Sequence, residues 1–115
     1  MGTFAKGDVV LYPFPYTNLK GQKLRPCLVL SNEMNDDILL CQITSQKVKA
    51  DEFSIELKKD ETIDGTLIID SFIRCNMLFT CDKSDIKKVI CRVDEEKYIK
   101  ISLMINRIIS IDKSK

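Results

Sequence analysis

Hydrophobic residues fall mostly in short runs and alternating stretches, a pattern typical of β-strands. Glu52–Leu57 alternates cleanly, with Phe53, Ile55 and Leu57 apolar, which predicts a half-buried antiparallel strand. Four consecutive apolar residues, Cys27–Leu30, predict a strand covered on both faces. The other predicted extended segments are Asp8–Phe14, Ile38–Ile43, Leu67–Cys75, Leu78–Cys81 and Val89–Val93. Many short strands of this kind predict a small, strongly bent sheet or partly closed barrel.

Polar and charged segments separate these strands. Asn32–Asp37 and Asp82–Asp85 have the composition of turns, and Lys58–Gly65 ends in an Asp-Gly pair that is a strong turn signal. Near Leu67 a short helical turn is an alternative to an extended segment. The strands are therefore expected to follow one another through short connections.

The last part of the chain changes period and predicts an amphipathic helix over Asp94–Ile109. Asp94 is suited to cap this helix, and two glutamates follow in its first turn, where the helix dipole favours negative charge. The apolar stripe consists of Tyr98, Ile101, Met104, Ile105 and Ile108. We expect the stripe to pack on the sheet of the same domain; a groove for a partner is the alternative.

A length of 115 residues with 44% hydrophobic residues predicts a single domain over residues 1–115 with one core. No long uncharged apolar run is present, so we expect no membrane partner, and Met1–Asp8 lacks the apolar stretch of a signal peptide. A cytoplasmic protein is the resulting expectation. The net charge of +1 disfavours avid binding to duplex nucleic acid but leaves short single strands open.

Cysteine and histidine counts limit the chemistry. The five cysteines have no CxxC spacing and four lie in apolar runs, so we expect buried, reduced thiols. The chain has no histidine, which removes Ser-His-Asp and Cys-His catalysis and the two-histidine ribonuclease mechanism. We expect no cofactor and no structural zinc.

The segment Gly7–Ser31 is the most informative part of the chain. Its first strand is followed by a loop that contains proline and glycine, and the loop places Arg25 and Pro26 at the start of a strand expected to be buried. A guanidinium in that place suits a phosphate clamp. The alternative is a surface arginine paired with Glu33 or Asp37.

Residues 42–46 (QITSQ) are a second candidate, because a hydrophobic strand ends there in two hydroxyls and two amides. Thr44, Ser45 and Gln46 can donate hydrogen bonds to phosphate oxygens. The alternative is a turn in which the hydroxyls bond their own backbone.

The loop Phe14–Lys23 places aromatic rings beside lysines, which suits stacked bases and a tracked phosphate backbone. Solvated lysines are the alternative. The candidate substrate-binding residues of this loop are Phe14, Tyr16, Lys20 and Lys23.

The sequence GDVVLYPFPYTNLKGQKLRPCLVLS over Gly7–Ser31 resembles the start of the MazF/PemK family of toxins, ribonucleases from bacterial toxin–antitoxin systems. The Arg-Pro pair after a glycine-containing loop is the family's clearest motif, and the resemblance implies that Arg25 is catalytic. Thr44 matches a threonine at the end of the third strand, the family's second active-site residue. The resemblance is weaker but present over Cys41–Gln46 and from Ser71 to the terminal helix.

The segment Ser71–Thr80 resembles the family strand that lines the same groove. Some members carry an acidic residue, proposed to transfer a proton, where this chain has Asn76, and an amide cannot accept a proton at neutral pH. Arg74 corresponds to an arginine used by part of the family; a structural ion pair is the alternative. Cys75 is a further candidate for proton transfer.

The resemblance implies an SH3-like barrel with helical additions, paired as a homodimer. It also implies an endoribonuclease that cleaves single-stranded messenger RNA without a metal, by attack of the RNA's own 2′-hydroxyl. A cognate antitoxin would restrain it through a short acidic or amphipathic segment in the same groove, and DNA would be contacted only through that antitoxin. The alternatives are a non-catalytic SH3-like module for RNA or peptide, and a component of an antitoxin-bound repression complex.

Overall fold

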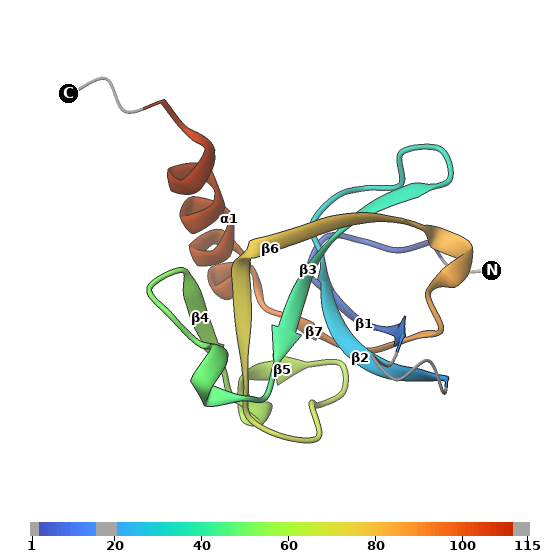
Figure 1. Ribbon diagram of the computed structural model, residues 1–115, viewed down its shortest axis with the longest axis horizontal. Helices are drawn as coiled ribbons and strands as arrows, with labels where there is room; N and C mark the ends of the chain where they lie inside the picture. Colours follow the sequence, from blue (N-terminus) through green and yellow to red (C-terminus); the bar gives the residue numbers. More distant parts are fainter. Residues whose placement is uncertain (1–2, 16–20, 112–115) are drawn as a thin grey trace.

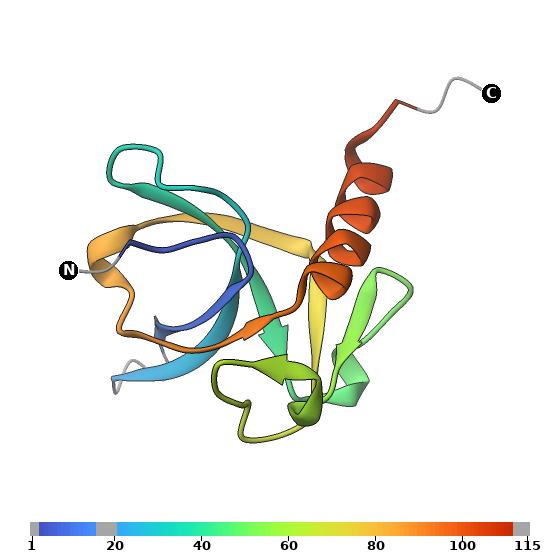
Figure 2. The same cartoon turned by 180° about the vertical axis from the view of Figure 1, so that it is seen from behind.

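A curled antiparallel sheet forms most of the computed structural model, which describes residues 3–15 and 21–111 (Figure 1). Its strands are β1 (Asp8–Pro15), β2 (Gln22–Val29), β3 (Asp37–Thr44), β4 (Ser54–Leu57), β5 (Thr62–Ile63), β6 (Ser71–Asp82) and β7 (Lys88–Val93). The strand order is β4-β6-β3-β2-β1-β7-β5. Both views place the two edge strands, β4 and β5, at the same end of the molecule, so the barrel is nearly closed (Figures 1 and 2). The predicted class, mainly β with a C-terminal helix, is confirmed.

Helical elements are short apart from the last one. The 3-10 turns are η1 (Lys47–Lys49), η2 (Lys59–Glu61) and η3 (Lys83–Asp85), and the C-terminal helix is α1 (Glu95–Ile109). Within the described residues, no helix has the length and apolarity needed to cross a bilayer.

Strand boundaries differ from the predictions where side chains bond the backbone or where pairing is non-local. β4 begins only at Ser54, because Asp51 accepts a hydrogen bond from the N–H of Phe53 (3.0 Å) and holds a turn there. β6 begins only at Ser71, since Asp70 accepts from the N–H of Lys59 (2.9 Å) and keeps the preceding residues in a loop. It then runs unbroken to Asp82, joining the two predicted segments into one strand.

β2 begins at Gln22, well before the predicted apolar run. Its polar first half pairs with β1, where Lys23 lies opposite Phe14 and Arg25 opposite Tyr12. Pairing with β1 therefore extends β2 into residues whose own sequence pattern does not predict a strand.

Strands β1 to β3 are covered on both faces, as predicted for Cys27–Leu30. One face carries a core that includes Val9, Leu28 and Ile101, which we name the helix-side core. The opposite face carries a second core that includes Val10 and Cys27, which we name the aromatic-side core because Tyr12, Phe14 and Phe79 pack against it. All five cysteines are buried and free, as predicted.

β6 bends sharply in its middle, and the corner is visible in Figure 1. Opposite β3, the register shifts between Cys41, which pairs with Leu78, and Ile43, which pairs with Ile73. Residues 74–77 of β6 therefore face the single residue Gln42 of β3. A bulge of this kind bends the strand and redirects its side chains.

α1 begins as predicted, because the Asp94 carboxylate accepts a hydrogen bond from the N–H of Lys97 (2.8 Å). The helix packs on the protein's own sheet: Ile101 is fully buried, and the hydroxyl of Tyr98 donates to the carbonyl of Leu30 (3.1 Å). Ile108, which the stripe included, lies near the helix end and is exposed.

The predicted Asp-Gly turn is present. Asp64 has φ 55° and Gly65 has φ 129°. A Cβ atom on Gly65 would lie 2.1 Å from the carbonyl oxygen of Ile90 on β7. Only glycine fits this approach of the turn to β7 without displacing backbone.

Candidate functional site

Arg25 and Thr44 lie on the same face of neighbouring strands. Strands β2 and β3 are antiparallel, and Cys27 of β2 pairs with Gln42 of β3. The paired residues run from Cys27–Gln42 to Val29–Leu40, and Arg25 and Thr44 lie on their strands two residues beyond the Cys27–Gln42 end of this ladder. Side chains alternate along a strand, so Arg25 is on the side of Cys27 and Thr44 on the side of Leu40, the aromatic-side face. Both side chains on which the sequence analysis depended therefore project from the aromatic-side face of neighbouring strands.

Arg25 is exposed. Within the described residues it forms no salt bridge, so the predicted alternative, an ion pair with Glu33 or Asp37, is not observed. Glu33 instead accepts a hydrogen bond from Lys83 Nζ (2.7 Å) and another from the backbone N–H of Phe4 (3.0 Å). In the part of the chain that the structure describes, no acidic side chain pairs with the Arg25 guanidinium.

Thr44 is half-buried, and its hydroxyl oxygen accepts a hydrogen bond from the N–H of Gln46 (3.1 Å). This is the backbone bond foreseen as the alternative to a functional role. The two are compatible, because the accepted bond orients the hydroxyl and leaves its proton free to donate. Ser45 and Gln46 follow as exposed residues at the end of β3.

Arg74 comes from the start of the β6 bend. Phe72 pairs with Thr44 across the β3–β6 ladder, and alternation places Arg74 on the same face. Its Nε is buried and has no hydrogen-bond partner among the described residues, so the predicted ion pair is not observed. Asn76 lies exposed within the bulge.

Three aromatic rings lie on this face. Tyr12 and Phe14 of β1 have centroids 5.3 Å apart, and Phe79 of β6 lies 5.2 Å from Tyr12 and 5.7 Å from Phe14. The sequence analysis selected Phe14 but missed Tyr12 and Phe79. Alternation from Phe14 could have identified Tyr12; the contact with Phe79 depends on the curl of the sheet and has no local signal.

Lys23 is exposed and lies opposite Phe14. Tyr16 and Lys20, predicted to bind substrate, lie outside the described residues.

The thiols are poor candidates for chemistry. Burial raises the pKa of Cys75 to about 11 and that of Cys27 to about 12. Burial also raises the pKa of Cys41, whose thiol donates to the carbonyl of Arg74 (2.9 Å). Proton transfer by Cys75 at neutral pH is therefore disfavoured.

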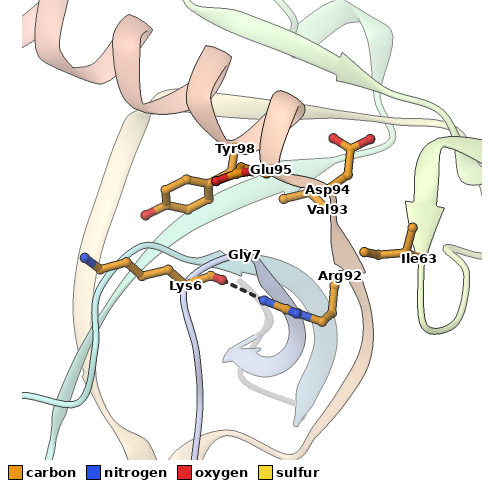
Figure 3. Close-up of a pocket in the computed structure, with 8 residues that line it drawn as sticks. All are labelled: Lys6, Gly7, Ile63, Arg92, Val93, Asp94, Glu95 and Tyr98. Atoms are coloured by element: carbon orange, nitrogen blue, oxygen red, sulfur yellow. Dashed lines mark hydrogen bonds between the residues drawn. The ribbon is translucent and has the colours of Figure 1, made fainter.

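A separate pocket of about 320 Å³ lies at the start of α1 (Figure 3). It is lined by Lys6, Gly7, Ile63, Arg92, Val93, Asp94, Glu95 and Tyr98. Arg92 is already satisfied there, since its Nε donates to Asp8 (2.9 Å) and its terminal nitrogen to the carbonyl of Lys6 (3.0 Å). The pocket contains none of the predicted site residues.

Comparison with known proteins identifies related sequences and structures. The family model for the PemK-like, MazF-like toxin of type II toxin–antitoxin systems matches residues 5–109. No match was found among curated proteins.

Several solved structures share the fold. A MazE–MazF crystal structure from Deinococcus radiodurans (Form-II) superposes with a TM-score of 0.69 at 14% identity, covering 97% of this chain and 100% of that chain. An endoribonuclease in complex with its cognate antitoxin, from a mycobacterial species, gives 0.70 at 14% identity, with 93% of each chain covered. The Mycobacterium tuberculosis toxin MazF-mt6 gives 0.66 at 16% identity, covering 90% of this chain and 98% of that chain. At these identities the likeness shows a common fold, in agreement with the predicted small barrel.

Proposed function

Because the chain belongs to the PemK-like, MazF-like toxins of type II toxin–antitoxin systems, we propose that it is an endoribonuclease that cleaves single-stranded messenger RNA without a metal ion. Structural neighbours described as endoribonucleases support this proposal. The observation that carries it is that Arg25 and Thr44, on the neighbouring strands β2 and β3, project from the same face of the sheet.

The reaction uses a nucleophile that the RNA itself contains. The 2′-hydroxyl oxygen attacks the adjacent phosphorus, the bond from phosphorus to the 5′-oxygen breaks, and the proton passes through water to the leaving oxygen. The products are a 2′,3′-cyclic phosphate and a 5′-hydroxyl. The protein has to align these atoms and stabilise the charge of the pentacoordinate transition state.

Arg25 supplies the main electrostatic stabilisation in this mechanism. Its exposed guanidinium presents two parallel donors to the non-bridging oxygens of the phosphate. A guanidinium does not release its proton at neutral pH, so Arg25 acts by charge and hydrogen bonding rather than as an acid or base. Thr44 donates its hydroxyl proton to the same phosphoryl group, oriented by the bond from Gln46.

Other residues hold the rest of the RNA. Lys23 contacts a neighbouring phosphate, and Arg74, whose buried Nε lacks a partner among the described residues, provides a further cation. Additional substrate contacts come from Phe14, Tyr16, Lys20, Ser45, Gln46 and Asn76. Asn76 contributes hydrogen bonds and cannot act as the base.

A cognate antitoxin is the proposed partner. Solved neighbours include toxins with their antitoxins, such as the MazE–MazF structures. In this proposal the antitoxin binds the face that carries Arg25. The toxin forms a homodimer in the cytoplasm, and any contact with DNA is made by the antitoxin.

Cleavage of single-stranded RNAs of varied sequence by purified protein, in the presence of a chelator, tests the proposal. Alanine in place of Arg25 is expected to reduce the rate by about 10² to 10³, the usual cost of losing one preorganised donor. Arg107→Ala, which removes an exposed cation from the last turn of α1, is the matched control and should cleave normally. Cleavage that requires a divalent ion, or that survives Arg25→Ala at the full rate, would contradict the mechanism.

A non-catalytic RNA-binding module is the second candidate, and Asn76 is the observation that favours it. In that case the wild-type protein would bind single-stranded RNA and leave it intact under all conditions. Analysis of the fragment ends separates the two functions.

A further inference from the structure

The rings of Tyr12 and Phe79 come together although their strands are not neighbours. β1 and β6 are separated by β2 and β3 in the sheet, yet the two ring centroids lie 5.2 Å apart with their planes tilted by 59°. The contact requires the sheet to curl around this face. The two rings therefore pack against each other beside the aromatic-side core.

Cations border this aromatic surface. Arg25 lies directly opposite Tyr12, and Lys23 directly opposite Phe14, so each ring of β1 has a positive side chain beside it on β2. Both cations are exposed, and the rings are half-buried. Alternation of rings and cations at this spacing suits a nucleic-acid strand, whose bases stack on rings while its phosphates meet the cations.

We propose that Tyr12 and Phe79 form the stacking surface for an unpaired base next to the phosphate that Arg25 holds. The inference rests on the proposed function, since it takes single-stranded RNA as the ligand. The exposed sides of the rings contact the base, and their buried sides close the aromatic-side core, whose nearest members include Val10 and Cys27. The charge of Lys23 and Arg25 favours a polyanion over an uncharged apolar peptide as the occupant.

A pair of labelled RNAs tests this proposal. Both are short, of mixed sequence and fully 2′-O-methylated, so neither can be cleaved; one has all its bases, and the other has abasic sites at its central positions with the same phosphates. Fluorescence anisotropy measures the affinity of each. The wild-type protein should prefer the RNA with bases by about fivefold to about a hundredfold, the range for loss of one stacked base.

Phe79→Leu and Tyr12→Leu should remove most of this preference, while Tyr12→Phe, which keeps the ring, should retain it. Lys23→Ala is the matched control for phosphate contacts and should weaken the binding of both RNAs by the same factor. Phe53→Leu removes a half-buried ring near the start of β4 and should change neither affinity. Thermal unfolding of each variant shows that it is folded.

Equal affinity of wild type for the two RNAs would overturn the inference, as would an unchanged preference in a folded Phe79→Leu variant. If the rings bind only an antitoxin peptide, the wild-type protein would bind the two RNAs with equal affinity. Because these RNAs cannot be cleaved, the outcome is independent of catalysis. If the protein prefers the RNA with bases through Phe79 but does not cleave unmodified RNA, the stacking surface is supported and the proposed enzymatic function is contradicted.

Discussion

At the scale of single residues, the proposed chemistry depends on how the Thr44 hydroxyl is held. Its oxygen accepts a hydrogen bond from the N–H of Gln46 (3.1 Å), which leaves the proton to donate. Thr44→Ser keeps this arrangement and should retain the cleavage rate within a few-fold. Thr44→Val keeps the shape without the hydroxyl and should lose about 10² to 10³ in single-turnover rate. An equal loss in both variants would assign the effect to the methyl group and its packing.

The buried thiols allow a second test at this scale. Burial raises the pKa of Cys27 to about 12 and of Cys81 to about 11, so very little reactive thiolate exists near neutral pH. Iodoacetamide should therefore leave the native protein unmodified and add five labels after denaturation, one for each cysteine. Mass spectrometry of the intact protein measures both states. Rapid labelling of the native protein would show that the strands holding these thiols open frequently.

At the scale of elements, the turn before β6 depends on a single glycine. Gly65 has φ 129°, and a Cβ there would lie 2.1 Å from the Ile90 carbonyl oxygen. Gly65→Ala should reduce the free energy of unfolding by more than about 3 kcal/mol, because a steric clash adds to the backbone strain. Gly7→Ala is the control, because its φ is 94° but the nearest atoms lie 3.6 Å from the added Cβ. This variant should lose only about 1–3 kcal/mol of unfolding free energy. Urea denaturation measures both. Equal losses would show that the turn moves away from β7 easily.

Glu33 links two distant parts of the chain to its own loop and makes stability depend on pH. Its carboxylate accepts hydrogen bonds from Lys83 in η3 and from the N–H of Phe4, and these bonds lower its pKa below the ordinary value of 4.5. The stabilisation is present above pH 4.5 and is lost as the pH falls through the lowered pKa. The Tm of Glu33→Gln should therefore lie below that of wild type near neutral pH, with the difference shrinking in acid.

A thermal unfolding series between neutral and acidic pH measures this difference. A difference in Tm that stays constant down to the lowest pH would show that the carboxylate charge contributes nothing and that only the shape of the side chain matters.

The sequence predicted most elements but not all of their ends. Local patterns sufficed for β1, β3, β7 and α1, because alternation, apolar runs and an N-cap are properties of neighbouring residues. They failed for β2, whose polar start is extended by pairing with β1, and for β6, whose start is delayed by a hydrogen bond from Lys59 to Asp70. Both failures have their cause in a partner on another segment, which the pattern of the strand's own residues does not show.

At the scale of the whole molecule, the candidate site was predicted only in part. Arg25 and Thr44 were selected from motifs, and the β2–β3 register then brought them to one face. The aromatic surface was not predicted as a unit, because Tyr12 and Phe79 are far apart in sequence and meet only through the curl of the sheet. Sequence thus identified the residues suited to phosphate, and the fold added a surface suited to a base.

The charge balance of the molecule predicts how RNA binding depends on salt. The chain has 18 lysines and arginines against 17 acidic residues, so no general excess of positive charge attracts nucleic acid. The described cations that β2 and β6 carry on the aromatic-side face are Lys23, Arg25 and Arg74. Since each phosphate neutralised on a single strand contributes about −0.7 to the slope of log affinity against log salt, about three contacts give a slope near −2.

Anisotropy titrations of a cleavage-inert RNA from about 0.05 M to about 0.2 M salt should therefore show a loss of affinity of roughly fifteenfold. A duplex of the same sequence should bind more weakly throughout, because its bases cannot reach the rings of Tyr12 and Phe79. A slope steeper than about −5 would mean that many more phosphates are contacted than this face can reach. In that case the RNA would follow a surface well beyond Arg25, and the compact site formed by β1, β2, β3 and β6 would be only part of its path.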